Sequence, residues 1–274
     1  MLNLVRRNPL VSYFSLAYFI SWTIWSPFVA SAQGWVDWDV PGALYYIGPY
    51  GPLLSALIVT AITSGGEGVR DLFRRVVKFR VAFRYYAFAI LVPVGLFVLA
   101  YFVNFIVTGA PSDLGLLGEA DYLQPLGSLG VLGLWVLTYG LGEETGWRGF
   151  ALPHLQKNRS AASATLILAL LWVGWHLPAF FFRDTYVELG ILGFPMFVIM
   201  MIFTTMVFTW LYNSTSGSIW IAIVFHAFFN WLSVSEAGGQ FVAPLMSLPM
   251  VVWALFIPRR YGMENCSPLP KQTA

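Results

Sequence analysis

Residues 189–235 read LGILGFPMFVIMMIFTTMVFTWLYNSTSGSIWIAIVFHAFFNWLSVS and contain no Lys, Arg, Asp or Glu, and a single histidine, His226. A helix that spans a bilayer needs about 20 predominantly apolar residues, so this stretch is long enough for two. Its middle, residues 213–218 (NSTSGS), is a polar turn pattern. The stretch therefore predicts two membrane-spanning helices joined by a short turn.

Six further stretches without Lys, Arg, Asp or Glu extend this pattern over the rest of the chain: residues 8–36, 40–66, 85–112, 122–142, 160–182 and 237–258. Across the 274 residues, 58% are hydrophobic and 10% are charged, whereas a soluble domain carries about 25% charged residues. No Pro/Ser-rich or charged linker divides the chain. We therefore expect an all-α polytopic membrane protein, a single domain over residues 1–274 that forms a bundle of eight transmembrane helices.

The basic residues predict the orientation of this bundle. With the N-terminus in the cytoplasm, thirteen of the fifteen Lys and Arg fall on the cytoplasmic side, which is the bias that sets topology. These are Arg6, Arg7, Arg70, Arg74, Arg75, Lys78, Arg80, Arg84, Lys157, Arg159, Arg259, Arg260 and Lys271. We expect a cell-membrane protein with both termini cytoplasmic and a first helix that acts as a signal anchor. The net charge of +2 does not indicate a nucleic-acid partner.

Polar side chains inside the predicted spans are few and lie in the second half of the chain. Each ionised one costs roughly 2.5–3.5 kcal/mol on insertion scales, so each needs a reason to be there. Three pairs are spaced four residues apart, which on a helix places both members on one face. The pairs are Glu144 and Arg148, Trp172 and His176, and His226 and Asn230. We expect the three helices to share a cavity.

Glu143, about 100° round the helix from Glu144, faces a different neighbour. Beside His176 and His226 it is typical of acid–base catalysis, because low-dielectric surroundings suit a carboxylate to proton transfer near neutral pH. A neutral histidine positions a water or ligates a metal, and the Asn230 amide can donate to an oxyanion. Peptide hydrolysis needs these groups, and the sequence has no HExxH or GxSxG motif.

Two expectations accompany this site. The carboxylate of Glu143 reaches the depth of the histidines if its helix continues past Pro153 to about Gln156, which we expect. For Glu144 and Arg148, a structural ion pair and a role in supporting catalysis both stay open.

The three motifs resemble those of the CAAX protease and bacteriocin-processing (CPBP, or Abi) family of intramembrane endopeptidases. Residues 143–148, EETGWR, match its EExxxR motif; residues 172–176 match FxxxH with Trp in place of Phe; residues 226–230 match HxxxN. They occur in the family's order, on successive predicted spans, and define a catalytic core over residues 121–235. The resemblance implies an enzyme similar to type II CAAX prenyl endopeptidases, with an eight-helix fold.

The resemblance also implies roles. Glu143 and His176 would activate water, His226 and Asn230 would bind the oxyanion, and Glu144, Arg148 and Trp172 would support the site. The substrate would be a membrane-associated peptide or lipidated protein, reached from a cytoplasm-facing cavity. A divalent metal such as zinc, held by Glu143, His176 and His226, and a metal-free mechanism both stay open. The resemblance assigns no oligomeric state.

Two other functions compete with peptide hydrolysis. A proton-coupled transporter would use the same carboxylate and histidines as a relay. Transporters commonly show an internal repeat with broken helices in both halves, and the first three predicted spans hold no counterpart of the polar motifs. A non-catalytic membrane scaffold or bacteriocin self-immunity protein would keep its function without Glu143.

Overall fold

The computed structural model describes residues 2–118, 123 and 126–274, and every regular element among them is helical. Glu119 and Asp121 lie outside the described residues. Asp121 is the first residue of the predicted catalytic core. The expectation of an all-helical membrane protein is confirmed for the part of the chain that the structure describes.

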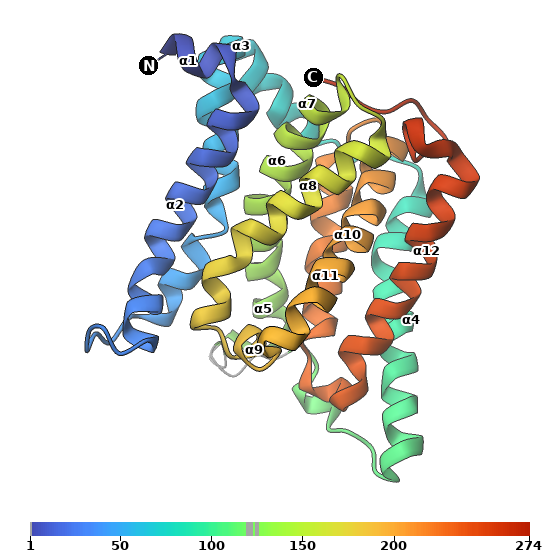
Figure 1. Cartoon of the computed structure of the whole chain (residues 1–274). Helices are drawn as coiled ribbons and strands as arrows, with labels where there is room; N and C mark the ends of the chain where they lie inside the picture. The colour runs from blue at the N-terminus through green and yellow to red at the C-terminus, as the bar shows by residue number, and fades with distance from the viewer. Residues whose placement is uncertain (1, 119–122, 124–125) are drawn as a thin grey trace.

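The chain runs back and forth along long helices. In order they are α2 (Pro9–Ala32), after the short α1 (Leu2–Arg7); α3 (Tyr50–Val76), after the 3₁₀ segment η1 (Gly42–Ile47); α4 (Phe83–Thr108); a helical run from α5 to α7 over residues 127–156; α8 (Ala161–His176); α10 (Gly190–Ser214); α11 (Ile219–Ser233); and α12 (Val242–Asn265). Shorter connecting helices are η2 (Leu114–Leu116), η6 (Leu177–Phe181), α9 (Asp184–Val187) and η7 (Glu236–Phe241). Figure 1 shows α2 and α3 on one side of the bundle and α4 and α12 on the other, with the remaining helices between them.

Four helical segments among the described residues are long and apolar enough to cross a membrane: Gly42–Val76, Phe83–Thr108, Ala161–Phe181 and Gly190–Ser214. The chain is therefore a multi-pass membrane protein. Helix α11 is apolar but has only 15 residues, about 22 Å at 1.5 Å per residue, which is less than the hydrocarbon thickness of about 30 Å. The prediction of eight spans with cytoplasmic termini thus stays a prediction.

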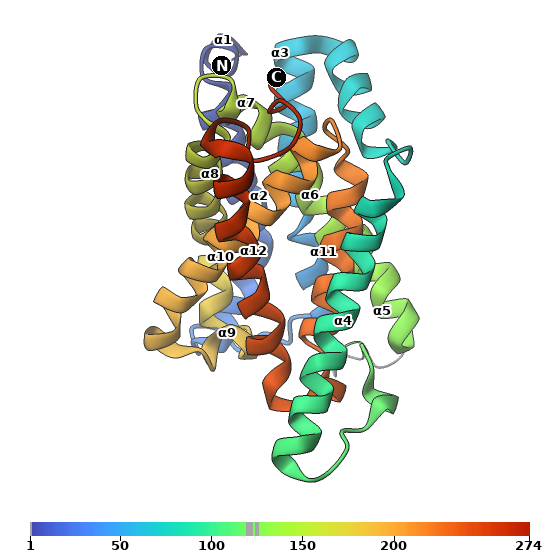
Figure 2. The ribbon, with the colours of Figure 1, turned by 90° about the vertical axis from the view of Figure 1, so that its right-hand side faces the viewer.

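Both termini lie at the same end of the bundle (Figure 1). The connections at this end contact one another: Lys78 Nζ donates to the carbonyl of Ser216 at 2.8 Å, and Lys271 Nζ donates to that of Arg159 at 2.7 Å. Helix α3 breaks at Gly65, where φ is 65°, and the chain after it crosses the same end (Figure 2). We call it the basic end, because it holds the thirteen Lys and Arg named above.

The helical run over residues 127–156 continues past Pro153, as the sequence analysis expects. Proline has no N–H, so it leaves the carbonyl of the residue four positions earlier without its helical partner. That carbonyl belongs to Gly149, and Arg75 Nη1 donates to it at 2.7 Å while also bonding the Tyr212 hydroxyl at 2.9 Å. A guanidinium from α3 thus bonds the backbone of the run four residues before the proline.

Close packing around this run depends on two glycines. A Cβ on Gly142 would lie 2.7 Å from the carbonyl oxygen of Pro49. One on Gly146 would lie 2.7 Å from the backbone carbon of Pro52 and even closer to the Tyr13 hydroxyl. Real Cβ atoms essentially never come this close to backbone, so these glycines allow the start of α3 to lie directly against the helix that carries the acidic motif.

This contact predicts that Gly146→Ala destabilises the fold by about 1–3 kcal/mol, the usual cost of overpacking a well-packed interior. The measurement is the thermal unfolding midpoint of the purified protein in detergent, which should fall. Gly95→Ala in α4 is the matched control, because a Cβ there meets nothing within 4 Å and alanine favours the helix. Equal midpoints for the two variants would contradict the close approach.

Candidate active site

The acidic motif lies where the helical run departs from α-helical geometry. The run begins as α5 (Gly127–Trp135), becomes the π-helix η4 (Val136–Glu143), returns briefly to α6 (Glu144–Gly146), and forms a second π-helix η5 (Trp147–Ala151) before α7 (Leu152–Gln156). π-Helical turns occur frequently at functional sites. The two glutamates lie on either side of the boundary between η4 and α6, and their side chains have different partners.

Glu144 is the centre of a buried charge cluster. Its Oε1 lies 3.0 Å from Arg148 Nη1 and 2.7 Å from His226 Nδ1, and the side chains of Glu144 and Arg148 are 0% exposed. The guanidinium carbon of Arg148 stands 4.4 Å from the centroid of the Trp172 ring and 4.0 Å from that of Phe208. The predicted pairing of Glu144 with Arg148 is therefore present, and two aromatic faces stabilise the cation.

Glu143 is held by indoles instead of by a cation. Its Oε2 accepts hydrogen bonds from Trp172 Nε1 at 2.9 Å and from Trp147 Nε1 at 3.3 Å. Trp147 lies four residues along the same run, whereas Trp172 comes from α8. The carboxylate is thus fixed in position without a salt bridge of its own, which leaves it suited to exchange a proton.

The hydrogen bonds also assign the protons of the two histidines. His176 Nδ1 lies 2.7 Å from the carbonyl oxygen of Trp172, and a carbonyl can only accept, so Nδ1 carries the proton. In the neutral ring Nε2 is then the proton acceptor. His226 Nδ1 meets the Glu144 carboxylate that already accepts from Arg148, so this nitrogen donates as well.

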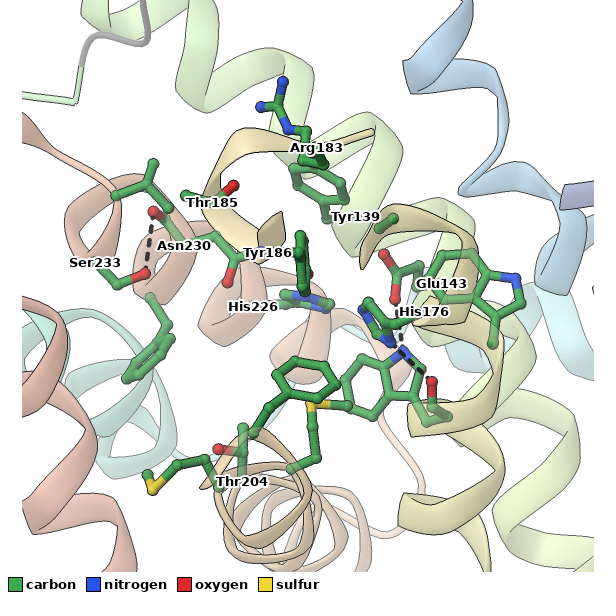
Figure 3. A pocket seen from close by; sticks show the side chains of 18 of the residues that line it. Tyr139, Glu143, His176, Arg183, Thr185, Tyr186, Thr204, His226, Asn230 and Ser233 are labelled. Atoms are coloured by element: carbon green, nitrogen blue, oxygen red, sulfur yellow. Dashed lines mark hydrogen bonds between the residues drawn. The ribbon is translucent and has the colours of Figure 1, made fainter. Parts of the chain in front are cut away.

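One cavity of about 380 Å³ collects these groups. Glu143, Trp172, His176, His226 and Asn230 all line it, as the sequence analysis predicts. Figure 3 shows His226 between Asn230 on one side and Glu143 and His176 on the other. Glu144 and Arg148 are not among the lining residues, so they support the site from behind its wall.

Other lining residues were not predicted. Tyr139 precedes Glu143 by four residues on the same run and stacks on the His226 ring, with centroids 6.3 Å apart and planes 22° apart. That spacing was visible in the sequence. Phe208 and Tyr186 lie outside the three motifs, and only the tertiary structure brings them to the cavity.

The cavity reaches the surface at the end of the bundle away from the termini. Its lining includes the exposed Thr185 and Leu189, in the connection between α8 and α10, together with Arg183. The opening of the cavity and the two termini therefore lie at opposite ends of the bundle. The expectation of a cytoplasm-facing cavity and the expectation of cytoplasmic termini are incompatible in this fold.

The proposed metal ligands do not form a ligand set. Glu143, His176 and His226 share the cavity, but within the described residues no three His, Cys, Asp or Glu side chains form a group that could hold a metal ion. A catalytic zinc needs three converging protein ligands and an open position. The described residues of the cavity do not fit that group.

Part of this chain is similar in sequence to known proteins. Residues 125–232 match the family described as type II CAAX prenyl endopeptidase Rce1-like. A protein named CAAX prenyl protease 2, from Methanococcus maripaludis, is 30% identical over 93 residues, which are 32% of this chain and 34% of that protein. Both matches support a likeness to the CPBP/Rce1-like family over the part of the chain that carries the site. Every predicted site residue, from Glu143 to Asn230, lies within the family match. The chain spans about a third of the length of the relative that it matches.

The charge cluster predicts a large cost for breaking it on one side. Arg148→Met leaves a buried carboxylate without its cation, so the free energy of unfolding should fall by about 3–5 kcal/mol. The double variant Glu144→Gln/Arg148→Met should lose less than the two single variants together, because neither charge is then left alone. Chemical unfolding in detergent measures both.

Arg80→Met is the control for the loss of an arginine, since Arg80 is exposed in the connection between α3 and α4. A loss of stability in Arg148→Met no greater than that in Arg80→Met would contradict the structural role of the pair.

Proposed function

We propose that this protein is an intramembrane endopeptidase that hydrolyses a peptide bond of a membrane-associated substrate with a water activated by Glu143 and His176. The observation that carries the proposal is the convergence of Glu143, His176, His226 and Asn230 on one cavity. The match to the Rce1-like family over residues 125–232 and the similarity to a CAAX prenyl protease support a CAAX protease-type activity.

The first step is the activation of water. A water between the Glu143 carboxylate and His176 Nε2 would give up one proton to this pair as its oxygen attacks the carbonyl carbon of the scissile bond. The Nδ1–H bond of His176 to the Trp172 carbonyl supports this role, because it leaves Nε2 as an acceptor. The two indoles on Glu143 hold the carboxylate at the place of attack.

The second step is the stabilisation of the tetrahedral oxyanion. The Asn230 amide can donate to it, and His226 can donate from Nε2 when the ring is protonated. The Glu144 carboxylate at 2.7 Å from His226 Nδ1 stabilises the positive charge on the ring in that form. When the C–N bond breaks, the leaving amine takes back the proton that the water lost.

The cavity lining supports an apolar or lipidated substrate. Aromatic and methionine side chains make up much of it: Trp25, Tyr45, Trp135, Tyr139, Trp172, Trp175, Tyr186, Phe197, Met200, Met201, Phe208 and Phe229. Such walls bury apolar groups favourably. We therefore propose a peptide that carries a lipid or an apolar segment, of the prenylated CAAX type, in contact with the bilayer.

Substitution at the proposed base tests the function. Glu143→Gln and His176→Gln keep side-chain size and should each lower the rate of cleavage about 10²–10⁴-fold, the usual contribution of a positioned acid or base. The assay is cleavage of a fluorogenic prenylated CAAX peptide by purified protein in nanodiscs. Unchanged thermal unfolding midpoints would show that the variants fold.

His154→Gln is the matched control, since His154 bonds the carbonyl of Phe150 and is absent from the cavity lining. Its rate should equal that of the wild type. Cleavage by Glu143→Gln at the wild-type rate would overturn the mechanism. A folded wild-type protein that leaves the peptide intact would overturn the CAAX-type substrate.

Removal of divalent metal gives a separate prediction. Because the cavity side chains do not form a three-ligand group, cleavage should persist after treatment with a chelator and dialysis. The same nanodisc assay measures it, with and without added Zn²⁺. Activity that a chelator abolishes and zinc restores would show that a metal takes part.

A further inference from the structure

A groove lies at the edge of the bundle, where α1 and α2 pack against α3. Figure 1 shows these three helices together at that edge. The groove holds about 640 Å³, and apart from two serines its described lining is apolar. None of its described lining residues belongs to the catalytic cavity. The apolar side chains come from all three helices and include Leu2 and Val5 of α1, Leu16 and Phe19 of α2, and Ile58 and Ile62 of α3.

The groove faces outward from the bundle. Val59, which also lines it, is 1% exposed, whereas Phe19 and Ile58 are 68% and 44% exposed. The helical segment Gly42–Val76, which carries Ile58 and Val59, is long and apolar enough to cross a membrane. Exposed apolar surface on such a segment contacts lipid, because it avoids water and needs no polar partner. We therefore expect a hydrocarbon chain to fill the groove.

Helix α1 has little protein around it. It has six residues, none of them buried, and Leu2 and Leu4 are 57% and 63% exposed. A helix this short is not stable through its own hydrogen bonds, so the groups that cover it help to hold it in place. A chain in the groove would cover Leu2 and Val5, which line it.

Two arginines stand at one end of the groove. Arg6 Nε donates to the carbonyl of Ile62 at 3.1 Å, and Ile62 lines the groove. Arg7 follows on α1, and both arginines are exposed. Residues 1–36 contain no Asp or Glu, and the ion pairs found among the described residues do not involve Arg6 or Arg7. This end of the groove is therefore positively charged.

We propose that the groove binds an anionic phospholipid, with one acyl chain against the apolar lining and the phosphate at Arg6 and Arg7. Burial of apolar surface favours the chain. A guanidinium donates paired N–H bonds to phosphate oxygens, and basic residues beside a bilayer attract anionic lipids. The bound lipid joins α1 to α2 and α3. Because the groove is separate from the catalytic cavity, the inference does not depend on the proposed endopeptidase function.

Photolabelling of the purified protein in detergent micelles tests this site. The probe is phosphatidylglycerol with a photoactivatable group in its acyl chain, and mass spectrometry quantifies the label on residues 58–62. Unlabelled phosphatidylglycerol or phosphatidylcholine with the same chains competes with it. We expect phosphatidylglycerol to compete about 10–30-fold more strongly, since each arginine contributes roughly fivefold in affinity. Both lipids should compete equally for the label on Phe102 and Ile106, which are exposed on α4.

One pair of variants tests the headgroup. Arg6→Gln/Arg7→Gln should remove the preference for phosphatidylglycerol over phosphatidylcholine. Arg259→Gln/Arg260→Gln is the matched control, because it changes two adjacent exposed arginines of α12 at the same end of the bundle, and it should keep the preference. Thermal unfolding midpoints equal to that of the wild type would show that both variants fold.

A second pair tests the chain without a change of charge. Ser15 is exposed and lines the groove, so Ser15→Trp places an indole where the chain would lie, and most of the label on residues 58–62 should be lost. Val11→Trp is the control, because Val11 is 66% exposed on the same helix and is absent from the described lining. Its label should equal that of the wild type.

Three results would overturn the inference. The first is equal competition by the two lipids at residues 58–62, or a preference that survives in Arg6→Gln/Arg7→Gln. The second is label that Ser15→Trp leaves unchanged. The third is displacement of the probe by glycerol phosphate, which carries the charge without the chains and should not compete. That displacement would show an anion site instead of a lipid site.

Discussion

The carboxylate of Glu144, shared between Arg148 and His226 inside an apolar bundle, is the interaction on which the site depends. A carboxylate left alone in such surroundings costs several kcal/mol. One oxygen that meets a guanidinium and an imidazole offsets that cost, and it ties α11 to the helical run that holds the acidic motif. Trp172 and Phe208 close around the cation, so α8 and α10 join the same cluster.

This cluster separates the tasks of two adjacent glutamates. Glu144 is committed to charge balance behind the cavity wall, whereas Glu143 meets only indole N–H groups and lines the cavity. The change between π-helical and α-helical turns at residues 143 and 144 lies where the two side chains diverge. A fixed carboxylate without a cation beside it, next to a histidine whose Nδ1 is already bonded, is an arrangement suited to moving the proton of a water.

Among the described residues, the exposed part of the cavity lining lies at the end of the bundle away from the termini. Hydrogen bonds join Gln156, Asn213 and the C-terminal segment at the basic end, and the connection between α8 and α10 lines the opening at the opposite end. The family resemblance alone favoured a cavity that faces the cytoplasm. The alternation of the helices places the opening at the end opposite the termini. The termini and the cavity opening therefore cannot both face the cytoplasm.

Local patterns in the sequence determined the helical membrane fold and much of the site. Apolar stretches predict helices because in lipid each stretch must satisfy its own backbone N–H and C=O groups with internal hydrogen bonds. A spacing of four residues predicts the Glu144–Arg148 pair because such residues share a helix face. Only the tertiary structure decided that Arg75 bonds the carbonyl of Gly149, that Trp172 holds Glu143, and which end of the cavity is open. Those contacts join segments that are distant in the chain, and residue periodicity carries no information on how distant segments meet. The number of spans stays with the sequence-based prediction, since α11 is shorter than a bilayer core.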